Sequence, residues 1–184
     1  KRILPGKTTI VSIRTASIGY AVPGTVIAVG VIIPFAWLDG RIDSFMQSSI
    51  GISSGLILSG TIVAVMFAYV VRFLAVSLQA VESGLGKIKP SMEVAARSLG
   101  CRPLKTLFKI HIPLMKSSTL TALMIVFVDV MKELPATLIL RPFDFNTLAV
   151  RAFELASDER LADSSTAALT IIFVGLAPVI YLSK

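Results

Sequence analysis

The chain has 184 residues, of which 54% are hydrophobic and only 16% are charged, and its formal net charge is +7. Its mean hydropathy is +0.82. This composition excludes an ordinary soluble domain and indicates a membrane protein. A helix that crosses the bilayer needs about 20 mostly apolar residues, so uncharged stretches of that length locate the candidate spans.

Three uncharged stretches pass this test. They cover residues 15–38, residues 44–71 and residues 164–183. A fourth stretch, residues 117–140, is equally apolar except for charged residues in its second half. We therefore predict an all-α membrane protein in which about four spanning helices form a bundle, with residues 1–184 as a single domain.

Small side chains distinguish the second stretch. Gly51, Gly55 and Ser59 recur every four residues, and such a stripe allows a neighbouring helix to approach closely. The spacing predicts that this helix lies in the interior of the bundle.

The positions of Lys and Arg predict the topology, because these residues favour the cytoplasmic side. With four spans, the N-terminal tail, the loop after the second stretch and the C-terminal end lie on the same side of the membrane, and these segments hold thirteen Lys and Arg residues. Four fall on the opposite side, namely Arg41, Arg141, Arg151 and Arg160. We expect both chain ends and a loop of residues 73–116 to face the cytoplasm. The same bias accounts for the positive net charge, so no nucleic acid partner is expected.

The predicted loop contains the pattern of two short helices. Residues 91–99 form the first, with Glu93 in its first turn, where a carboxylate suits the helix dipole, and Gly100 just past its end. Pro103 begins the second helix and Pro113 ends it. The two helices are expected to form a compact projection from the membrane.

These residues resemble a motif of a known family. Permease subunits of binding-protein-dependent ABC importers have a cytoplasmic motif of the form E-A-A, three residues, G, nine residues, I-x-L-P. The sequence matches this motif in register at Ala95, Ala96, Gly100, Ile110 and Pro113. It departs from the motif twice, because Val94 stands where the family has Glu, with Glu93 one place earlier, and Ile112 replaces Leu.

In that family the motif forms coupling helices that dock into a cleft of a separate ATPase subunit, and the resemblance implies the same role here. Small alanines permit close approach, and a glycine permits a sharp turn. The expected coupling residues are Glu93, Ala95, Ala96, Gly100, Pro103, Ile110, Ile112 and Pro113. The alternative is a basic amphipathic hairpin on the membrane surface. His111 is expected on a helix surface rather than as a ligand.

No catalytic or nucleotide-binding motif accompanies these features. Gly6 and Lys7 resemble the end of a phosphate-binding loop, but Lys1 stands where the first glycine of that loop is required. No residues predict a metal site or a cofactor, and Cys101 has no cysteine partner in the chain. ATP hydrolysis is therefore expected on a separate subunit, and the chain itself is not expected to be an enzyme.

The fourth stretch carries Asp129, Lys132 and Glu133, followed by Pro135. Charged residues at membrane depth are costly and normally face a bundle interior or a water-filled cavity. One interpretation is that these four residues line a translocation pathway or gate, with the helix bent at the proline. The other is that the helix ends near Val130 and the charges lie at the outer interface.

Two longer strings narrow the resemblance. Residues 19–25 (G-Y-A-V-P-G-T) and residues 132–137 (K-E-L-P-A-T) look like permeases of ferric iron importers. Those permeases often contain two similar halves, and this chain is similar to the C-terminal half, so we expect it to be a piece of a longer polypeptide. The resemblance implies an inner-membrane location, a second permease half, membrane lipid around the helices, and a periplasmic binding protein. The external, modestly acidic segment of residues 143–163 is a candidate place for that protein to dock, and simple solvation explains its acidic residues as well.

The cargo is left open by the residues themselves. The resemblance favours ferric iron, but related permeases carry thiamine, polyamines, sulfate, molybdate or phosphonates. A function of another class is a membrane-embedded enzyme or sensor that recruits a cytoplasmic partner through its basic loop.

Overall fold

A computed structural model describes residues 6–182, and within that range every regular element is a helix. The elements are α1 (Lys7–Ile18), α2 (Gly24–Ile50), α3 (Ile62–Gly86), α4 (Pro90–Ser98), α5 (Pro103–Thr106), a π-helical turn (Leu107–His111), α6 (Ile112–Met131), α7 (Pro135–Leu140), α8 (Leu148–Ser157) and α9 (Leu161–Leu182). The predicted all-α class is confirmed.

Four helices are long and apolar enough to cross a membrane. They are α2, α3, the continuous helix Pro103–Met131 and α9. The last agrees with the predicted span 164–183 and begins three residues earlier, while Ser183 lies outside the described residues. The first three differ from the predicted spans in where they begin and end.

The first predicted span, residues 15–38, is not one helix. α1 ends at Ile18 and α2 begins at Gly24. Pro23 is the N-cap residue of α2, and its missing N–H disfavours a helix that runs on from α1 through it. A Cβ at Gly19 would overlap the carbonyl oxygen of Val71 on α3. The chain therefore passes close over α3 at this glycine before it turns into α2.

The second predicted span, residues 44–71, is also wrong as a single helix. It contains the end of α2, a loop at residues 51–61 and the beginning of α3. Gly51, Gly55 and Gly60 have φ values of 75°, 62° and 70°, in the left-handed region that glycine adopts readily. Gly51 and Gly55, which were predicted to lie on the packed face of a helix, thus form turns. Ser59, the third residue of that predicted stripe, is buried.

Two carboxylates of α2 hold this loop in place. Asp39 is 1% exposed and accepts hydrogen bonds of 2.7–3.2 Å from the backbone N–H groups of residues 57–59. Asp43, one turn later, accepts from the N–H groups of residues 54 and 55 and from the Ser53 hydroxyl. Because buried N–H groups need acceptors, these carboxylates allow the irregular loop to lie against the helix.

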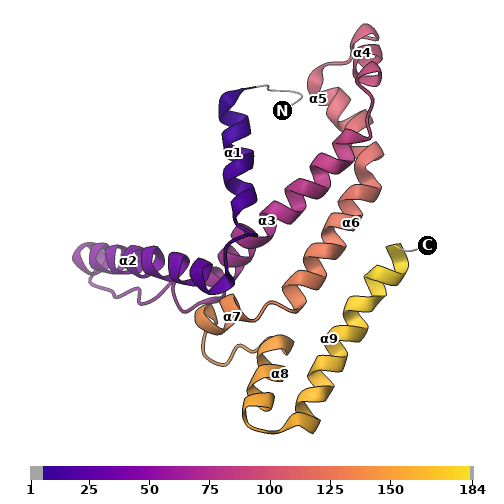
Figure 1. The fold of residues 1–184 in the computed structure, drawn as a ribbon. Helices are drawn as coiled ribbons and strands as arrows, with labels where there is room; N and C mark the ends of the chain where they lie inside the picture. Colours follow the sequence, from indigo (N-terminus) through magenta and orange to yellow (C-terminus); the bar gives the residue numbers. More distant parts are fainter. Residues whose placement is uncertain (1–5, 183–184) are drawn as a thin grey trace.

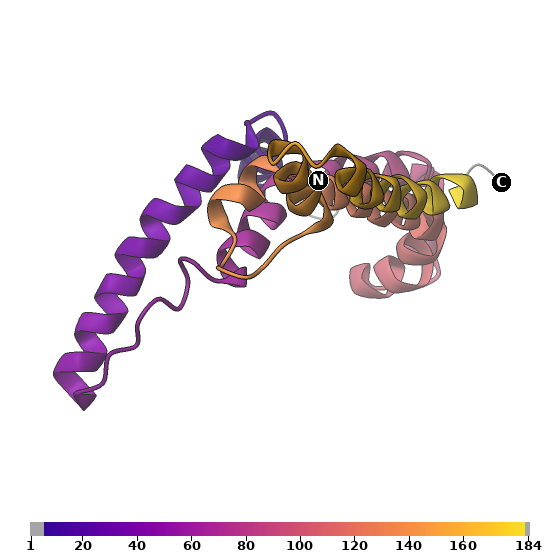
Figure 2. The same ribbon diagram turned by 90° about the horizontal axis from the view of Figure 1, so that it is seen from below.

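The helices form an elongated bundle with one projecting arm. α3 lies antiparallel to α6, and α8 lies beside the first part of α9 (Figure 1). α2 leaves the other helices at a steep angle and projects away from them with the returning loop beside it (Figures 1 and 2). Only the first part of α2 joins the buried core, which consists of Ile27, Ala28, Val31, Ala64, Val65, Ala68, Ala136 and Leu140.

Close packing of α3 on α6 depends on Gly84. A Cβ added there would lie 2.8 Å from Ser118 Cβ, whereas a Cβ at Gly86 in the same helix would meet no atom within 4 Å. We expect Gly84→Ala to destabilise the protein by about 1–3 kcal/mol through overpacking. Gly86→Ala is the matched control, with an unchanged or slightly raised stability. Thermal unfolding in detergent measures both, and equal melting temperatures for the two variants would refute the expectation.

Candidate functional site

Residues 90–111 form a projection, here called the knob, at one end of α3 and α6 (Figure 1). Pro90 occupies the first turn of α4, as does Glu93. α4 ends at Ser98, and the first predicted short helix, residues 91–99, is thus confirmed to within one residue at each end.

Gly100 makes the turn between the two helices of the knob. Its φ of 75° is left-handed, and the N–H groups of Gly100 and Cys101 donate to the carbonyls of Arg97 and Ala96, each at 2.9 Å. This arrangement satisfies the last carbonyl groups of α4. A side chain at position 100 would meet no atom within 4 Å, so the demand for glycine comes from the backbone conformation and not from space.

The second helix of the knob does not stop at Pro113, contrary to the sequence-based expectation. Helix Pro103–Met131 is continuous, and Pro113 lies in the first turn of α6 after the π-helical turn. In that turn the N–H of Ile112 donates to the carbonyl of Leu107, five residues back. The wider turn changes the hydrogen-bond pattern before the proline, which has no N–H to contribute. The knob is therefore joined directly to a spanning helix.

His111 is buried, so its expected place on a helix surface is wrong. It is 3% exposed, and its Nε2 lies 3.3 Å from Glu93 Oε1. Because the two residues belong to α4 and to the π-helical turn, their contact ties the two helices of the knob together. This contact gives Glu93 a structural partner that the motif alone did not indicate.

The structure brings half of the predicted coupling residues together. An open apolar groove between α4 and the start of α6 is lined by Ala95, Ala96, Ile110 and Pro113, among others. Glu93 and Pro103 line a second, smaller pocket beside His111, and Ile112 points outward. Large apolar side chains are exposed on the knob, namely Val94, Leu99, Leu104 and Phe108.

The predicted pathway residues lie where α6 and α7 meet. α6 ends at Met131, and Pro135 is the first residue of α7. The helix thus ends near Val130, as one interpretation held, yet Asp129 and Glu133 are only 8% and 5% exposed. Lys132, in contrast, is exposed. The structure thus places two buried carboxylates beside one exposed lysine.

Each buried carboxylate at this junction has a cationic partner. Lys132 Nζ lies 2.9 Å from Asp129 Oδ1. The hydrogen bond to Asp129 and the charge of that carboxylate raise the pKa of Lys132 above its ordinary value, so the ammonium remains protonated at neutral pH. Arg72 Nε lies 3.3 Å from Glu133 Oε2.

Arg72 is the residue at this junction that sequence reasoning missed. It was counted among the cytoplasmic charges after the second stretch, but it lies within α3 and contacts Glu133. An arginine inside an otherwise apolar helix is itself a signal of a buried partner. Because the second span was predicted to end at residue 71, Arg72 was assigned to the loop and was not recognised as a residue within a helix.

The remaining contacts of the junction fasten α7 to its neighbours. The Ala136 N–H donates to Glu133 Oε1 at 3.1 Å. The Thr137 hydroxyl donates to the Glu133 carbonyl, so the hydroxyl of Tyr69 on α3 donates to Thr137 over 2.5 Å. A Cβ at Gly24, the first residue of α2, would overlap Arg72 Nη1 and lie 2.8 Å from Glu133 Oε1. α2, α3, α6 and α7 therefore meet around one carboxylate.

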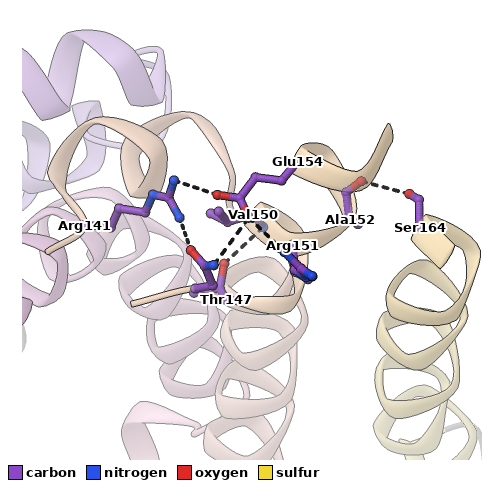
Figure 3. A network of polar contacts seen from close by, with 8 residues as sticks. Arg141, Thr147, Val150, Arg151, Ala152, Glu154 and Ser164 are labelled. Carbon is purple, nitrogen blue, oxygen red and sulfur yellow. Dashed lines mark hydrogen bonds and ion pairs between the residues drawn. The ribbon is translucent and has the colours of Figure 1, made fainter. Parts of the chain in front are cut away.

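A second polar network lies next to this junction, at the end of the bundle away from the knob (Figures 1 and 3). Glu154 on α8 receives Arg141 Nη2 at 2.8 Å and Asn146 Nδ2 at 3.3 Å, and Arg151 Nη1 lies 3.6 Å away. The Thr147 hydroxyl caps α8 by accepting from the Val150 N–H. These contacts give a defined shape to residues 141–157, in the segment where the binding protein is expected to dock.

We predict that Glu154→Ala loosens this segment by about 1–2 kcal/mol, because three donors lose a shared acceptor. Amide hydrogen exchange across residues 141–157 measures the change. Asp163→Ala is the matched control, since Asp163 pairs with a single, more exposed arginine, Arg160, and is expected to alter stability by less than about 0.5 kcal/mol. Exchange rates that rise equally in both variants would contradict the predicted role of Glu154.

Comparison with known proteins identifies the family. Residues 5–183 match the family described as binding-protein-dependent transport system inner membrane component. The Fe(3+)-transport system permease protein FbpB 2 of Haemophilus influenzae is 28% identical over 124 residues, which are 67% of this chain and 24% of that protein. A 2-aminoethylphosphonate transport system permease protein of Salmonella typhimurium is 34% identical over 119 residues, which are 65% of this chain and 44% of that protein.

A third relative, the ferric transport system permease protein of Actinobacillus pleuropneumoniae, is 31% identical over 121 residues, which are 66% of this chain and 15% of that protein. The matched region thus spans less than half of each relative. The family match covers almost the whole chain, and the structure has four helices long and apolar enough to span a membrane. The chain therefore belongs to the family of inner membrane components of binding-protein-dependent transport systems and is a multi-pass inner-membrane protein of the ABC importer permease type.

Proposed function

We propose that this chain is one half of the membrane channel of an ATP-driven importer for ferric iron, and that the knob docks onto a separate ATPase subunit. The observation that carries the proposal is the construction of the knob. Its apolar groove is lined by motif residues from both of its helices, and its second helix continues into a membrane span.

The exposed residues of the knob suit a protein partner. Leu99, Leu104 and Phe108 are 83%, 71% and 65% exposed, and large apolar side chains exposed on a projection suit contact with a protein partner. The turn at Gly100 sets the position of Leu99 relative to Leu104 and to the helix that continues into α6. A docked ATPase that moves the knob would therefore move the attached helix as one body.

The distribution of charge supports a cytoplasmic knob. Exposed basic residues gather on and next to it, namely Lys87, Lys89, Arg97, Arg102, Lys105, Lys109 and Lys116. Lys and Arg are enriched on the cytoplasmic side of membrane proteins. In this orientation α9 runs back towards the cytoplasm (Figure 1), and both chain ends are cytoplasmic. The opposite end, with α8 and the Glu154 network, then faces the periplasmic binding protein.

Other partners follow from the same arrangement. The spanning helices expose many large apolar side chains, which suit lipid and a second permease half. The three ferric and phosphonate relatives are all longer than the region they share with this chain. We expect residues 1–184 to form one half-channel unit within a longer polypeptide.

Substitution of Gly100 tests the coupling role. Only a left-handed backbone is required there, so Gly100→Asn is expected to retain most cargo uptake and Gly100→Val to abolish it, because a β-branched residue is strongly disfavoured at positive φ. Uptake into proteoliposomes that contain the complete importer measures the effect. Membrane insertion and copurification of the ATPase are recorded for each variant.

The outcome separates the proposal from its alternatives. Normal uptake with Gly100→Val would show that the knob does not couple ATP hydrolysis to transport. A hairpin that lies on the membrane surface would keep uptake but change lipid binding. A membrane-embedded enzyme or sensor would purify without an ATPase and a second permease half.

The cargo is tested by competition, since the relatives favour two candidates. The likeness to ferric permeases supports iron, and the 34% identity to a 2-aminoethylphosphonate permease supports a phosphonate as the second candidate. We expect uptake of radiolabelled ferric iron that excess 2-aminoethylphosphonate does not reduce. Uptake of labelled phosphonate with no iron uptake would overturn the assignment to iron and leave the transport function in place.

A further inference from the structure

The second helix of the knob belongs to a helix that is longer than a membrane span requires. Helix Pro103–Met131 has 29 residues, which gives a length of about 43 Å, whereas the hydrocarbon core is about 30 Å thick. About nine residues at one end must therefore lie beyond the hydrocarbon. The exposed charged residues of this helix are Lys105, Lys109 and Lys116, all in its first half. Residues 103–111 are thus the part that extends out of the membrane.

Two kinds of exposed side chain lie side by side on this extension. Leu104 and Phe108, one turn apart, are 71% and 65% exposed. The basic stripe, as we call Arg102, Lys105 and Lys109, follows a similar spacing, and all three residues are exposed. Residues three or four apart share one side of a helix, so the basic stripe runs directly beside the apolar pair.

The single carboxylate of the knob is turned away from this surface. The Glu93 side chain is 16% exposed, and its Oε1 lies 3.3 Å from Nε2 of the buried His111. Val94, at the position where the family motif has its glutamate, is 62% exposed. Neighbouring residues of a helix point about 100° apart, so a shift of one residue turns the carboxylate inward and leaves a valine outside. Among residues 90–111, all of which the structure describes, every exposed charged residue is therefore basic.

We propose that the ATPase subunit receives this face of the knob in a cleft with an apolar floor and an acidic rim. Leu104 and Phe108 contact the floor, and the basic stripe pairs with carboxylates of the rim. The inference rests on the proposed docking of an ATPase and adds the face that docks and the chemistry of the partner's surface. Lys109 also lines the apolar groove between α4 and α6, so the docking face is continuous with that groove.

The geometry favours a protein over anionic lipid, the other surface that attracts basic residues. An amphipathic helix that binds lipid lies flat in the membrane interface, whereas the basic stripe lies at the end of a continuous helix long enough to cross the membrane. The preference of Lys and Arg for the cytoplasmic side accounts for how many basic residues the knob carries. It does not account for their alignment beside Leu104 and Phe108.

Charge reversal tests the docking face. The full-length permease is placed in nanodiscs of zwitterionic lipid, and association of the purified ATPase is followed at low and at high salt. Lys105→Glu combined with Lys109→Glu is expected to slow association by about tenfold at low salt and to flatten its salt dependence, because charges at the rim of an interface act mainly on the association rate. Lys105→Gln with Lys109→Gln should act in the same direction but less strongly, which covers the case in which the glutamates disturb membrane insertion.

The matched control reverses two exposed lysines outside the stripe. Lys87 and Lys89 lie in the connection between α3 and α4, and Lys87→Glu with Lys89→Glu is expected to change the rate by less than about threefold. Equal slowing by both pairs would overturn the assignment of the face. An effect of the stripe that appears only in nanodiscs with anionic lipid would assign the stripe to lipid and refute the inference.

A suppressor selection identifies the chemistry of the partner's surface. ATPase variants that restore uptake to the importer with Lys105→Glu and Lys109→Glu are expected to exchange an acidic residue for a basic or neutral one. Suppressors of every other kind would count against an acidic rim. ATPase binding that salt does not change would refute only this inference, whereas a wild-type permease that binds no ATPase and takes up no cargo would refute the proposed function itself.

Discussion

Carboxylates pair with backbone N–H groups at two irregular places in this protein, the loop after α2 and the start of α7. An apolar interior offers no water to either group, so each must find the other. Asp39 receives the N–H groups of residues 57–59, where the chain is not helical. Glu133 receives the N–H that opens α7, where α6 has ended. At these two places an acidic side chain pairs with the irregular backbone.

Arg72 adds a constraint of a different kind, because it joins helices that are far apart in the sequence. Its contact with Glu133 sets α3 against the α6–α7 interruption, and Gly24 lets the first turn of α2 close over both. Removing one member of such a buried pair is costly, since the other is left unpaired. The pair thus explains why α2, α3 and the α6–α7 interruption meet at one place.

One continuous helix joins the knob to the junction. The π-helical turn accommodates Pro113 within a helix that would otherwise stop, and helix Pro103–Met131 then connects the knob to the junction. A loop in place of that helix would absorb motion, whereas a helix transmits it.

The sequence by itself determined the membrane class, the number of apolar spans and the turn at Gly100, since these depend on composition and on local backbone chemistry. It left open whether the helix bends at Pro135 or ends near Val130. It mistook the glycines at positions 51 and 55 for a packing stripe, because a four-residue spacing suits a helix face as well as a series of turns. Only the tertiary structure decided that Asp39 stabilises a folded-back loop, that His111 is buried against Glu93 and that Arg72 pairs with Glu133. Each of these joins residues from separate elements, and a pattern along one segment carries no information about the partner that another segment brings to it.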